Sequence, residues 1–489
     1  MAFLQRTMNR GSVSTGFNLD NSLLLEETDS GMNRNHQQMT VGGDDGWSAA
    51  SNAGTNSKKL TVSLWFKRSA LSTSASGSEY PVLWEFQSGG NKLKANLIGD
   101  KLKIYDDMQS ANLATKRLFR DFSAWYHVVI AIDATQGTAA NKVKIYVNGV
   151  QDTDLTDGAG SGSADYGNDA VLTAFNTTDV TICVGCDNNE DNTTFNGYIA
   201  DFHFVDGAQK AATDFGEFDE DSGIWKPKEY TGGHGTLGCY YNFEDTSSNK
   251  FNDESGNGND MNNRGDGFEG EITTDTPTNN FCTWNPLWNY SSYPKITEGA
   301  TKVRIDDSTD EGAKATIGLT NGKWYWEAKP VGTIGSQYMG IQTDGDSNIY
   351  ATANSMLNNY TMVINPTGRY YSYSGSLSES ADQGWDFTTS DWLGVALDME
   401  SSTQTIKYYK NGSLIQSVNL ISDMQDRTVF PFLINYENRS WDVNFGGHTI
   451  NTISSAANDE NGYGTFEYAP PSGYYAICGK NLAEFGGTA

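Results

Sequence analysis

The chain reads WYHVVIAID at residues 125–133 and, after a short turn, KVKIYVNG at residues 142–149. A related pair occurs later, as WLGVALD at residues 392–398 and TIKYYKNG at residues 405–412. Each pair consists of two alternating segments that end in Asn-Gly, which is the strongest short-range signal for a β-hairpin. The repetition predicts two β-domains of related architecture.

Alternation assigns the side chains of these segments to two faces, because neighbouring residues of a strand point to opposite sides. Apolar residues occupy every second position on one face: Val128, Ile130 and Ile132 in the first copy, and Leu393, Val395 and Leu397 in the second. The other face carries Trp125 and Asp133 in the first copy, and Trp392 and Asp398 in the second. Both copies therefore predict strands with one face in a core.

The rest of the chain is also typical of an all-β protein. It has 52 glycines and 25 tyrosines, and only 19% of its residues are charged, a composition that suits short strands and many turns. The only predicted helix is a short one at residues 208–215. Further strands are predicted at residues 16–25, 60–68, 82–86, 101–105, 180–185, 197–206 and 238–243.

A length of 489 residues predicts two or three domains. We expect a polar N-terminal arm, a first sandwich, a polar proline-containing linker, a second sandwich and a short tail. Their predicted bounds are 1–15, 16–272, 273–280, 281–475 and 476–489.

Net charge and apolar content exclude two classes of partner. A net charge of −28 argues against nucleic acid, which attracts positive surfaces. No run of 18 apolar residues and no signal-peptide core occur, so we expect no membrane insertion. By this reasoning the protein is made in a cytoplasm and stays there, or leaves by lysis or a non-classical route.

The cysteines predict neither a disulfide framework nor a zinc site. Their number, five, is odd. Cys183 and Cys186 have the spacing of a metal or redox pair, but no second Cys or His pair completes a zinc site. Buried structural thiols are the expectation, with a disulfide between the two as the alternative.

The segments quoted above resemble two known families. The first half, through residues 60–68, 125–133, 143–149 and 197–207, is similar to laminin-G/concanavalin A-like lectin domains. The second half is similar to SPRY-type domains, which are also concanavalin-like sandwiches. The segments that carry this second resemblance are residues 322–327, 340–342, 391–398, 407–412, 431–433 and 443–446.

The pairing of these halves adds a resemblance to virion proteins of marine bacteriophages. It rests also on FCTWNPL at residues 281–287 and PPSGYY at residues 470–475. The resemblance implies two concanavalin-like jelly-roll sandwiches in tandem and a place on the virion as a tail fibre, spike or capsid fibre. It also implies contact with other virion proteins and assembly as a homotrimer.

Binding to host-surface polysaccharide is the function we expect, without catalysis. Aromatic rings near turns could stack on sugars, although core packing is the alternative for each. These aromatic candidates are Trp225, Trp288, Tyr370, Tyr371 and Tyr373.

Calcium is the cofactor that the acidic loops admit, because hard cations take several carboxylate and carbonyl oxygens. No loop matches a full calcium motif, and ordinary Asp/Asn turn chemistry is the alternative. The candidate calcium ligands are Asp187, Asp191, Asp253, Asp260, Asp344 and Asp346.

Two other functions stay open. A polysaccharide depolymerase would need two carboxylates about 5–5.5 Å apart for retaining hydrolysis, and the acidic run at residues 217–221 is the only candidate. Glu217 and Asp219 would be its catalytic pair if the run were a strand, but a solvated acidic loop is the expectation. A bacterial lectin-type adhesin is the third function, and it lacks the expected export signal.

Overall fold

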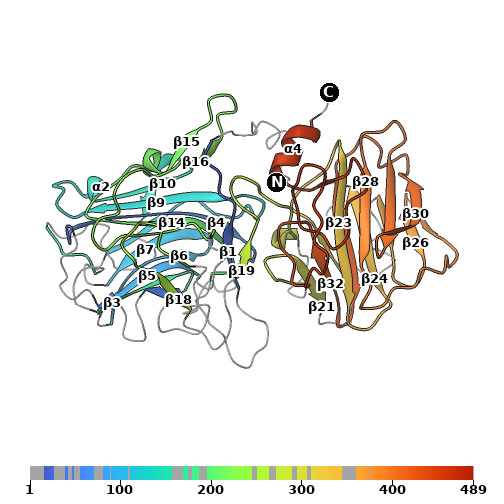
Figure 1. The fold of residues 1–489 in the computed structure, drawn as a ribbon, viewed down its shortest axis with the longest axis horizontal. Helices are drawn as coiled ribbons and strands as arrows, with labels where there is room; N and C mark the ends of the chain where they lie inside the picture. Colours follow the sequence, from blue (N-terminus) through green and yellow to red (C-terminus); the bar gives the residue numbers. More distant parts are fainter. Residues whose placement is uncertain are drawn as a thin grey trace. The chain divides into compact units, whose positions relative to one another are not determined.

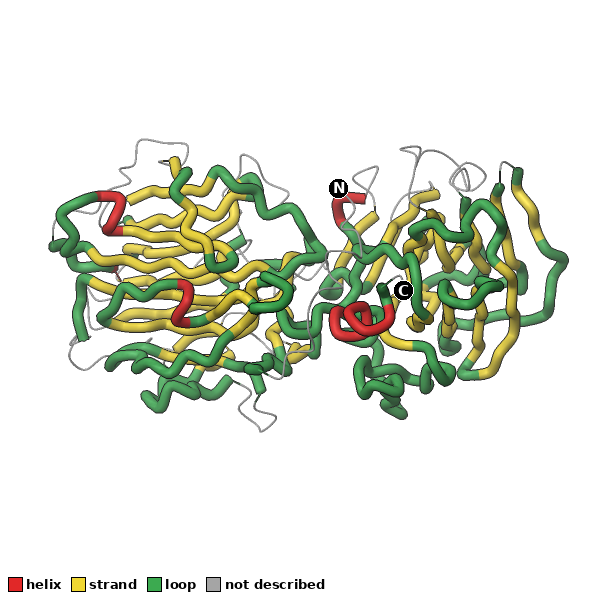
Figure 2. The backbone as a smooth tube through the Cα atoms, turned by 90° about the horizontal axis from the view of Figure 1, so that it is seen from above, coloured by secondary structure: helices red, strands yellow, loops and turns green. Residues whose placement is uncertain are grey.

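The structure is a computed structural model, and its chain forms two compact domains, Thr15–Thr278 and Asn279–Ala489. Strands dominate both domains, and the helices are short (Figures 1 and 2). None of the described helices is long and apolar enough to cross a membrane. The described residues are 16–26, 39–41, 47–48, 55–70, 81–88, 90–107, 111–156, 169–173, 179–186, 195–244, 251–263, 271–288, 294–305, 310–343, 360–374 and 376–487.

The first domain has two antiparallel sheets, named here sheet A and sheet B. Sheet A has the order β11-β10-β9-β4-β14-β1-β19, with β17 beside β14. Its strands are β1 Ser22–Leu25, β4 Lys59–Arg68, β9 Tyr126–Asp133, β10 Val143–Val147, β11 Val150–Asp152, β14 Gly197–Asp206, β17 Cys239–Tyr241 and β19 Glu271–Thr273.

Sheet B has the order β12-β8-β7-β6-β5-β13-β2-β18, with β3 beside β13. Its strands are β2 Met39–Val41, β3 Trp47–Ser48, β5 Val82–Ser88, β6 Asn91–Ile98, β7 Lys101–Asp106, β8 Ala111–Thr115, β12 Leu155–Thr156, β13 Asp179–Val184 and β18 Met261–Asn263. The core contains Val128, Ile130 and Ile132 from sheet A and Phe86, Leu93 and Ile104 from sheet B, all nearly inaccessible to solvent. Alternate residues of the same strands therefore lie on the two outer faces.

The second domain repeats this plan with sheets C and D. Sheet C has the order β20-β21-β32-β23-β28-β29-β30, with β33 beside β23, and sheet D has the order β22-β31-β24-β25-β26-β27. The strands of sheet C are β20 Pro294–Thr297, β21 Lys302–Ile305, β23 Lys323–Val331, β28 Leu393–Asp398, β29 Thr405–Lys410, β30 Ser413–Asn419, β32 Arg439–Asn444 and β33 Tyr475–Ala476. Those of sheet D are β22 Asp310–Lys314, β24 Gln337–Thr343, β25 Thr361–Ile364, β26 Tyr370–Tyr373, β27 Leu377–Glu379 and β31 Val429–Tyr436.

The repeated hairpin has the same geometry in both domains. The Asn148 side-chain oxygen accepts the backbone N–H of His127 at 2.8 Å, and Asn411 does the same for Trp392 at 2.8 Å. Both asparagines have a left-handed backbone, with φ of 47° and 48°. The structural counterpart of Trp392 is therefore His127, two residues after the tryptophan at which the sequence alignment begins.

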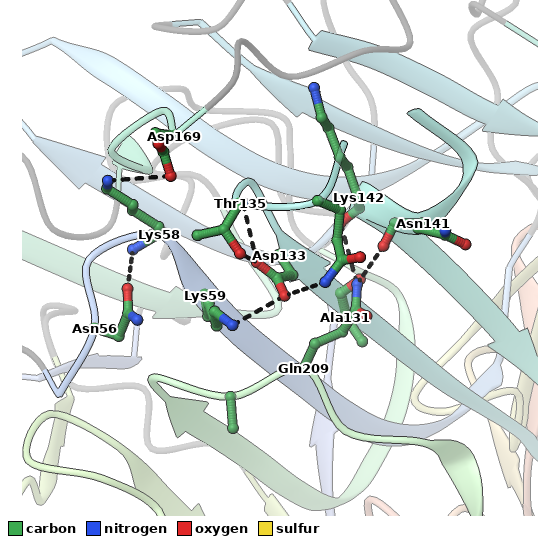
Figure 3. Close-up of polar contacts among 12 residues, drawn as sticks. Asn56, Lys58, Lys59, Ala131, Asp133, Thr135, Asn141, Lys142, Asp169 and Gln209 are labelled. Atoms are coloured by element: carbon green, nitrogen blue, oxygen red, sulfur yellow. Dashed lines mark hydrogen bonds and ion pairs between the residues drawn. The ribbon is translucent and has the colours of Figure 1, made fainter. Parts of the chain in front are cut away.

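The aspartate of each copy closes its strand in a similar way, as Figure 3 shows for Asp133. Asp133 accepts the Thr135 N–H and hydroxyl and pairs with Lys59 at 3.0 Å. Asp398 accepts two backbone N–H groups and pairs with Lys323 at 3.6 Å. These hydrogen bonds hold the Asp133 pKa at about 2 against the burial that raises it, and they lower that of Asp398.

The predicted linker and tail belong to the folded domains. Thr273 pairs with Ser22 in sheet A, and buried Asp275 lies 2.7 Å from the Lys67 ammonium. The tail adds β33 and then α4, Gly479–Phe485, whose Leu482 is fully buried in the second core. Each segment follows directly on a strand, since β19 ends at Thr273 and β33 at Ala476, and the boundary between the two domains falls inside the predicted linker, after Thr278. The predicted arm lies outside the described residues.

The predicted short helix at residues 208–215 is one 3₁₀ turn, η2 at Ala212–Asp214. A segment that contains this turn and the two-stranded hairpin of β15, Gly216–Phe218, and β16, Trp225–Pro227, packs on the outer face of sheet A. Apolar residues of sheet A and of this segment form a second buried cluster there, which includes Trp65, Val129, Tyr198, Phe215 and Trp225.

Candidate functional site

The outer face of sheet B carries a row of polar side chains that crosses five strands. The register places Glu85 of β5 beside Lys94 of β6, Lys94 beside Tyr105 of β7, and Tyr105 beside Asn112 of β8. Cys183 of β13 completes the row next to Glu85. Their strand neighbours face the core, so these five side chains form a row on the other face of the sheet.

Three amide oxygens on this face are buried without a hydrogen-bond partner among the described residues. They are Oε1 of Gln87 and Oδ1 of Asn96 and Asn112, and these residues are only 8%, 2% and 9% exposed. A buried acceptor without a donor costs about 1–3 kcal/mol. These three oxygens are therefore acceptors that the described part of the chain leaves unsatisfied.

Charge on the same face is concentrated around one buried carboxylate. Glu85 is fully buried, with the Lys94 and Lys92 ammonium groups 3.9 and 4.0 Å from its Oε2. The half-buried ring of Tyr105 has the Lys103 ammonium 5.5 Å from its centroid. A hydrogen bond to Asp107 and burial raise the pKa of Tyr105 to about 12, so its hydroxyl is neutral and donates to the Asp107 carboxylate.

The outer face of sheet A carries a network of side-chain hydrogen bonds beneath the covering segment. The Trp225 indole N–H donates to Nδ1 of His127 at 3.0 Å, and Nε2 of His127 lies 2.9 Å from the Ser63 hydroxyl. Beside them, His203 bonds Asp201 at 3.2 Å and His234 at 3.0 Å. This network joins the covering segment to the sheet.

This network corrects the prediction that Trp225 contacts a glycan. Trp225 is 8% exposed, and its ring lies near the Gly149 backbone, where an added Cβ would come within 2.3 Å of it. The Trp225 ring contacts His127 and Phe218, so it has the packing role that was the alternative to sugar binding.

In the second domain, three of the predicted aromatic residues meet on the outer face of sheet D. Trp288, Tyr371 and Tyr373 belong to one cluster with Phe432 and Tyr338. Trp288 belongs to the 3₁₀ turn η3, Pro286–Trp288, and the Lys314 ammonium lies 3.9 Å from its ring centroid.

Tyr370 lies on the opposite face of β26, where it is partly buried against the core, so it does not belong to this cluster. The hydroxyl of its neighbour Tyr371 donates to Glu379, which also pairs with Arg369. The aromatic face therefore has a charged, exposed rim.

The calcium candidates that can be located serve turn chemistry. The Asp253 carboxylate accepts the N–H groups of Tyr240, Ser255 and Asn259, and Asp260 accepts the N–H of Asp253. Within the described ranges, no group of three His, Cys, Asp or Glu residues could hold a metal ion. Asp187, Asp191, Asp344 and Asp346 lie outside those ranges.

The acidic run at residues 217–221 crosses the end of β15 and the turn after it. Lys226 pairs with both Glu217, at 3.5 Å, and Asp219, at 3.2 Å. Hydrogen bonds from Ser222 and Lys226 hold the Asp219 pKa below its ordinary value. General-acid catalysis needs a carboxyl with a raised pKa, and Asp219 has a lowered one.

The cysteines of the described residues are all buried free thiols, which confirms the structural expectation for Cys183 and Cys186. Burial raises the pKa of the Cys478 thiol to about 12, so it is protonated and unreactive at neutral pH.

Residues 41–213 match a family model, Laminin_G_3, of the concanavalin A-like lectin/glucanases superfamily. The first domain is concanavalin A-like. With the two pairs of sheets, this match confirms the predicted fold class of two concanavalin-like sandwiches in tandem. A comparison with curated proteins finds no match.

Three solved structures are similar to part of this chain. The SPRY domain of human HERC1 is 16% identical, with 33% of this chain and 96% of that chain covered and a TM-score of 0.25. A heptameric SAP-like pentraxin from Limulus polyphemus is 13% identical, with 39% and 78% covered and a TM-score of 0.24. The carbohydrate-binding module CBM66 from Bacillus subtilis is 11% identical, with 32% and 89% covered and a TM-score of 0.23.

The polar face of sheet B was not singled out from the sequence. The alternation of KLKIY at residues 101–105 already separates Lys101, Lys103 and Tyr105 from the apolar residues. The alternation does not predict the strand register, which places Tyr105 beside Lys94 and Asn112.

Proposed function

We propose that this protein binds carbohydrate without catalysis, through the outer face of sheet B. The observation that carries the proposal is the set of buried, unpartnered oxygens of Gln87, Asn96 and Asn112. Saccharides present many hydroxyl donors on a small surface, and each such donor would satisfy one of these acceptors. The half-exposed Tyr105 ring beside Asn112 supplies an apolar face for a sugar ring.

The aromatic face of sheet D supplies a second place for stacking. Trp288 and Tyr373 are partly exposed there, while Tyr371 is 9% exposed and held by Glu379. Two weak sites on one chain would act together, since linked sites gain avidity without any new contact.

The test is a glycan array probed with the whole chain and two variants. Asn112→Ala removes one acceptor from the proposed site, and Asn419→Ala makes the same change on an exposed position of β30. We expect Asn112→Ala to weaken binding about 2- to 10-fold, the effect of one hydrogen bond, and Asn419→Ala to bind as the parent does. No binding by the parent, or equal binding by the two variants, would refute the proposal.

The location we propose is the virion of a bacteriophage, as a tail fibre, spike or capsid fibre that attaches to host-surface polysaccharide. The support is the similarity of the paired halves, of residues 281–287 and of residues 470–475 to such proteins. A homotrimer in contact with other virion proteins would raise avidity by about 10²–10⁴. Mass spectrometry of purified particles tests the location, and light scattering of the pure protein tests the trimer.

A depolymerase is the competing function, and the pairing of Glu217 and Asp219 with one lysine counts against it. The direct test is the release of reducing ends from host polysaccharide. Release that disappears in a Glu217→Ala/Asp219→Ala variant would replace our proposal with an enzymatic one.

A further inference from the structure

Lys103 is a partly buried lysine on the proposed binding face of this acidic protein. It lies on the outer face of sheet B, with Asn96 of β6 on one side and the small Ala114 of β8 on the other. Burial and the nearby Lys94 ammonium lower the pKa of Lys103, so its surroundings disfavour its charge. Among the described residues it has no ion pair, and its ammonium faces the Tyr105 ring.

Two buried or partly buried lysines of the same domain have carboxylate partners, whereas Lys101, Lys144 and Lys210, like Lys103, have none among the described residues. Lys59 pairs with Asp133 at 3.0 Å, and fully buried Lys67 pairs with Asp275 at 2.7 Å. The chain has 61 acidic residues against 33 basic ones, so carboxylates are abundant. A half-buried ammonium without a carboxylate partner is therefore a place where an external anion can form an ion pair.

The groups around Lys103 define what else that anion must carry. The Oδ1 atom of Asn96, directly beside Lys103, is an unpartnered buried acceptor, and so is that of Asn112 beside Tyr105. Inorganic sulfate, which carries no proton at neutral pH, has no donor for these oxygens. A sugar that bears an acidic group has both, because its hydroxyls donate while its anionic oxygens accept from the ammonium.

We propose that the ligand of sheet B is an anionic saccharide whose acidic group pairs with Lys103 while its hydroxyls donate to Asn96 and Asn112. This inference rests on the proposed carbohydrate-binding function and names its ligand class. A carboxylate, as in a uronic acid, and a sulfate ester share the required chemistry.

The experiment is calorimetric titration of the whole chain with three oligosaccharides. Oligogalacturonates carry carboxylates, their methyl esters keep the same hydroxyls without charge, and sulfated galactan oligosaccharides carry sulfate. The parent is compared with Lys103→Gln and with Lys101→Gln, which removes the same charge two residues away on the same face of β7.

We expect the acidic oligosaccharides to bind more tightly than the esters. Lys103→Gln should weaken acidic ligands by about tenfold or more, the effect of a charge-assisted hydrogen bond, and leave the esters unchanged. Lys101→Gln should change both classes by less than about threefold, because a charge that makes no direct contact acts only through screened attraction. The carboxylated and sulfated arms show which acidic group the site takes.

Two outcomes would overturn the inference while the proposed function stands. One is equal affinity for acids and esters, and the other is an equal loss in the Lys103→Gln and Lys101→Gln variants, which would indicate general electrostatic attraction. If neither these three ligands nor any glycan of the array binds, the proposed function itself fails.

Discussion

Acidification from pH 8 to pH 5 should destabilise the first domain and leave the second nearly unchanged. Burial lowers the pKa of His127 to about 3 and that of His234 to about 4, from an ordinary value of 6.5. At pH 5 both are neutral in the folded domain and protonated when it unfolds. The pH lies 1.5 units below the unfolded pKa of 6.5, and each unit is worth 1.36 kcal/mol, so each histidine lowers the stability of the first domain by about 2 kcal/mol. Together they lower it by about 4 kcal/mol.

The hydrogen bonds give a structural reason for the low pKa of His127. The Trp225 indole can only donate, so Nδ1 of His127 must carry a lone pair, and its Nε2–H donates to Ser63. Protonation would place two donors face to face and break the contact that holds the hairpin of β15 and β16 to sheet A. The first domain thus loses stability as the pH falls from 6.5 toward 3.

In the second domain two shifts oppose each other. Burial lowers the pKa of His448 to about 4, which costs about 2 kcal/mol at pH 5. Burial also raises the pKa of Glu327 to about 7, from an ordinary 4.5. Its protonated form stabilises the fold fully below pH 4.5, and that contribution is lost as the pH rises through 7. Acidification to pH 5 therefore raises the stability of the second domain by about 2.5 kcal/mol through Glu327.

The assay is scanning calorimetry of the whole chain at pH 8 and pH 5. The melting temperature of the first domain should fall by about 8–16 °C, at 2–4 °C per kcal/mol, while that of the second moves little. His127→Gln, whose side chain does not titrate, should halve the loss in the first domain. Transitions that shift together, or an acid loss that is unchanged in His127→Gln, would refute the reasoning.

Three other substitutions test single contacts, each by denaturant unfolding. Lys67→Met should lower the free energy of unfolding by about 3–5 kcal/mol, because it leaves the Asp275 carboxylate buried without its cation. Adding Asp275→Asn should recover part of that loss. Equal losses in the single and double variants would contradict this. Asp253→Ala should lower the free energy of unfolding by about 3 kcal/mol, about one for each of the three backbone N–H groups left without an acceptor. A calcium-dependent difference in stability between the parent and this variant would show a metal role that we do not expect. Glu327→Gln should make the second domain lose about 2 kcal/mol from pH 8 to pH 5 through His448, whereas unchanged stability would point to other titrating groups.

Much of this fold is encoded locally and could be predicted. Alternation placed Val128, Ile130 and Ile132 in the core and Trp125 on the other face, because the side-chain period of a strand is two. Asn-Gly marked the end of both hairpins, since Asn148 and Asn411 both have the left-handed backbone that this turn needs. Repetition of these signals in each half was enough to predict two related sandwiches.

The candidate site could not be predicted in the same way. Its row of side chains exists because β5, β6, β7 and β8 pair in a register that aligns Glu85, Lys94, Tyr105 and Asn112, and a shift of one residue would send each to the other face. The burial of Trp225 likewise depends on a segment that folds back onto a sheet about one hundred residues earlier in the sequence. Alternation along a strand determines which residues share a face, but only the pairing of distant strands decides which residues become neighbours and which remain open to a ligand.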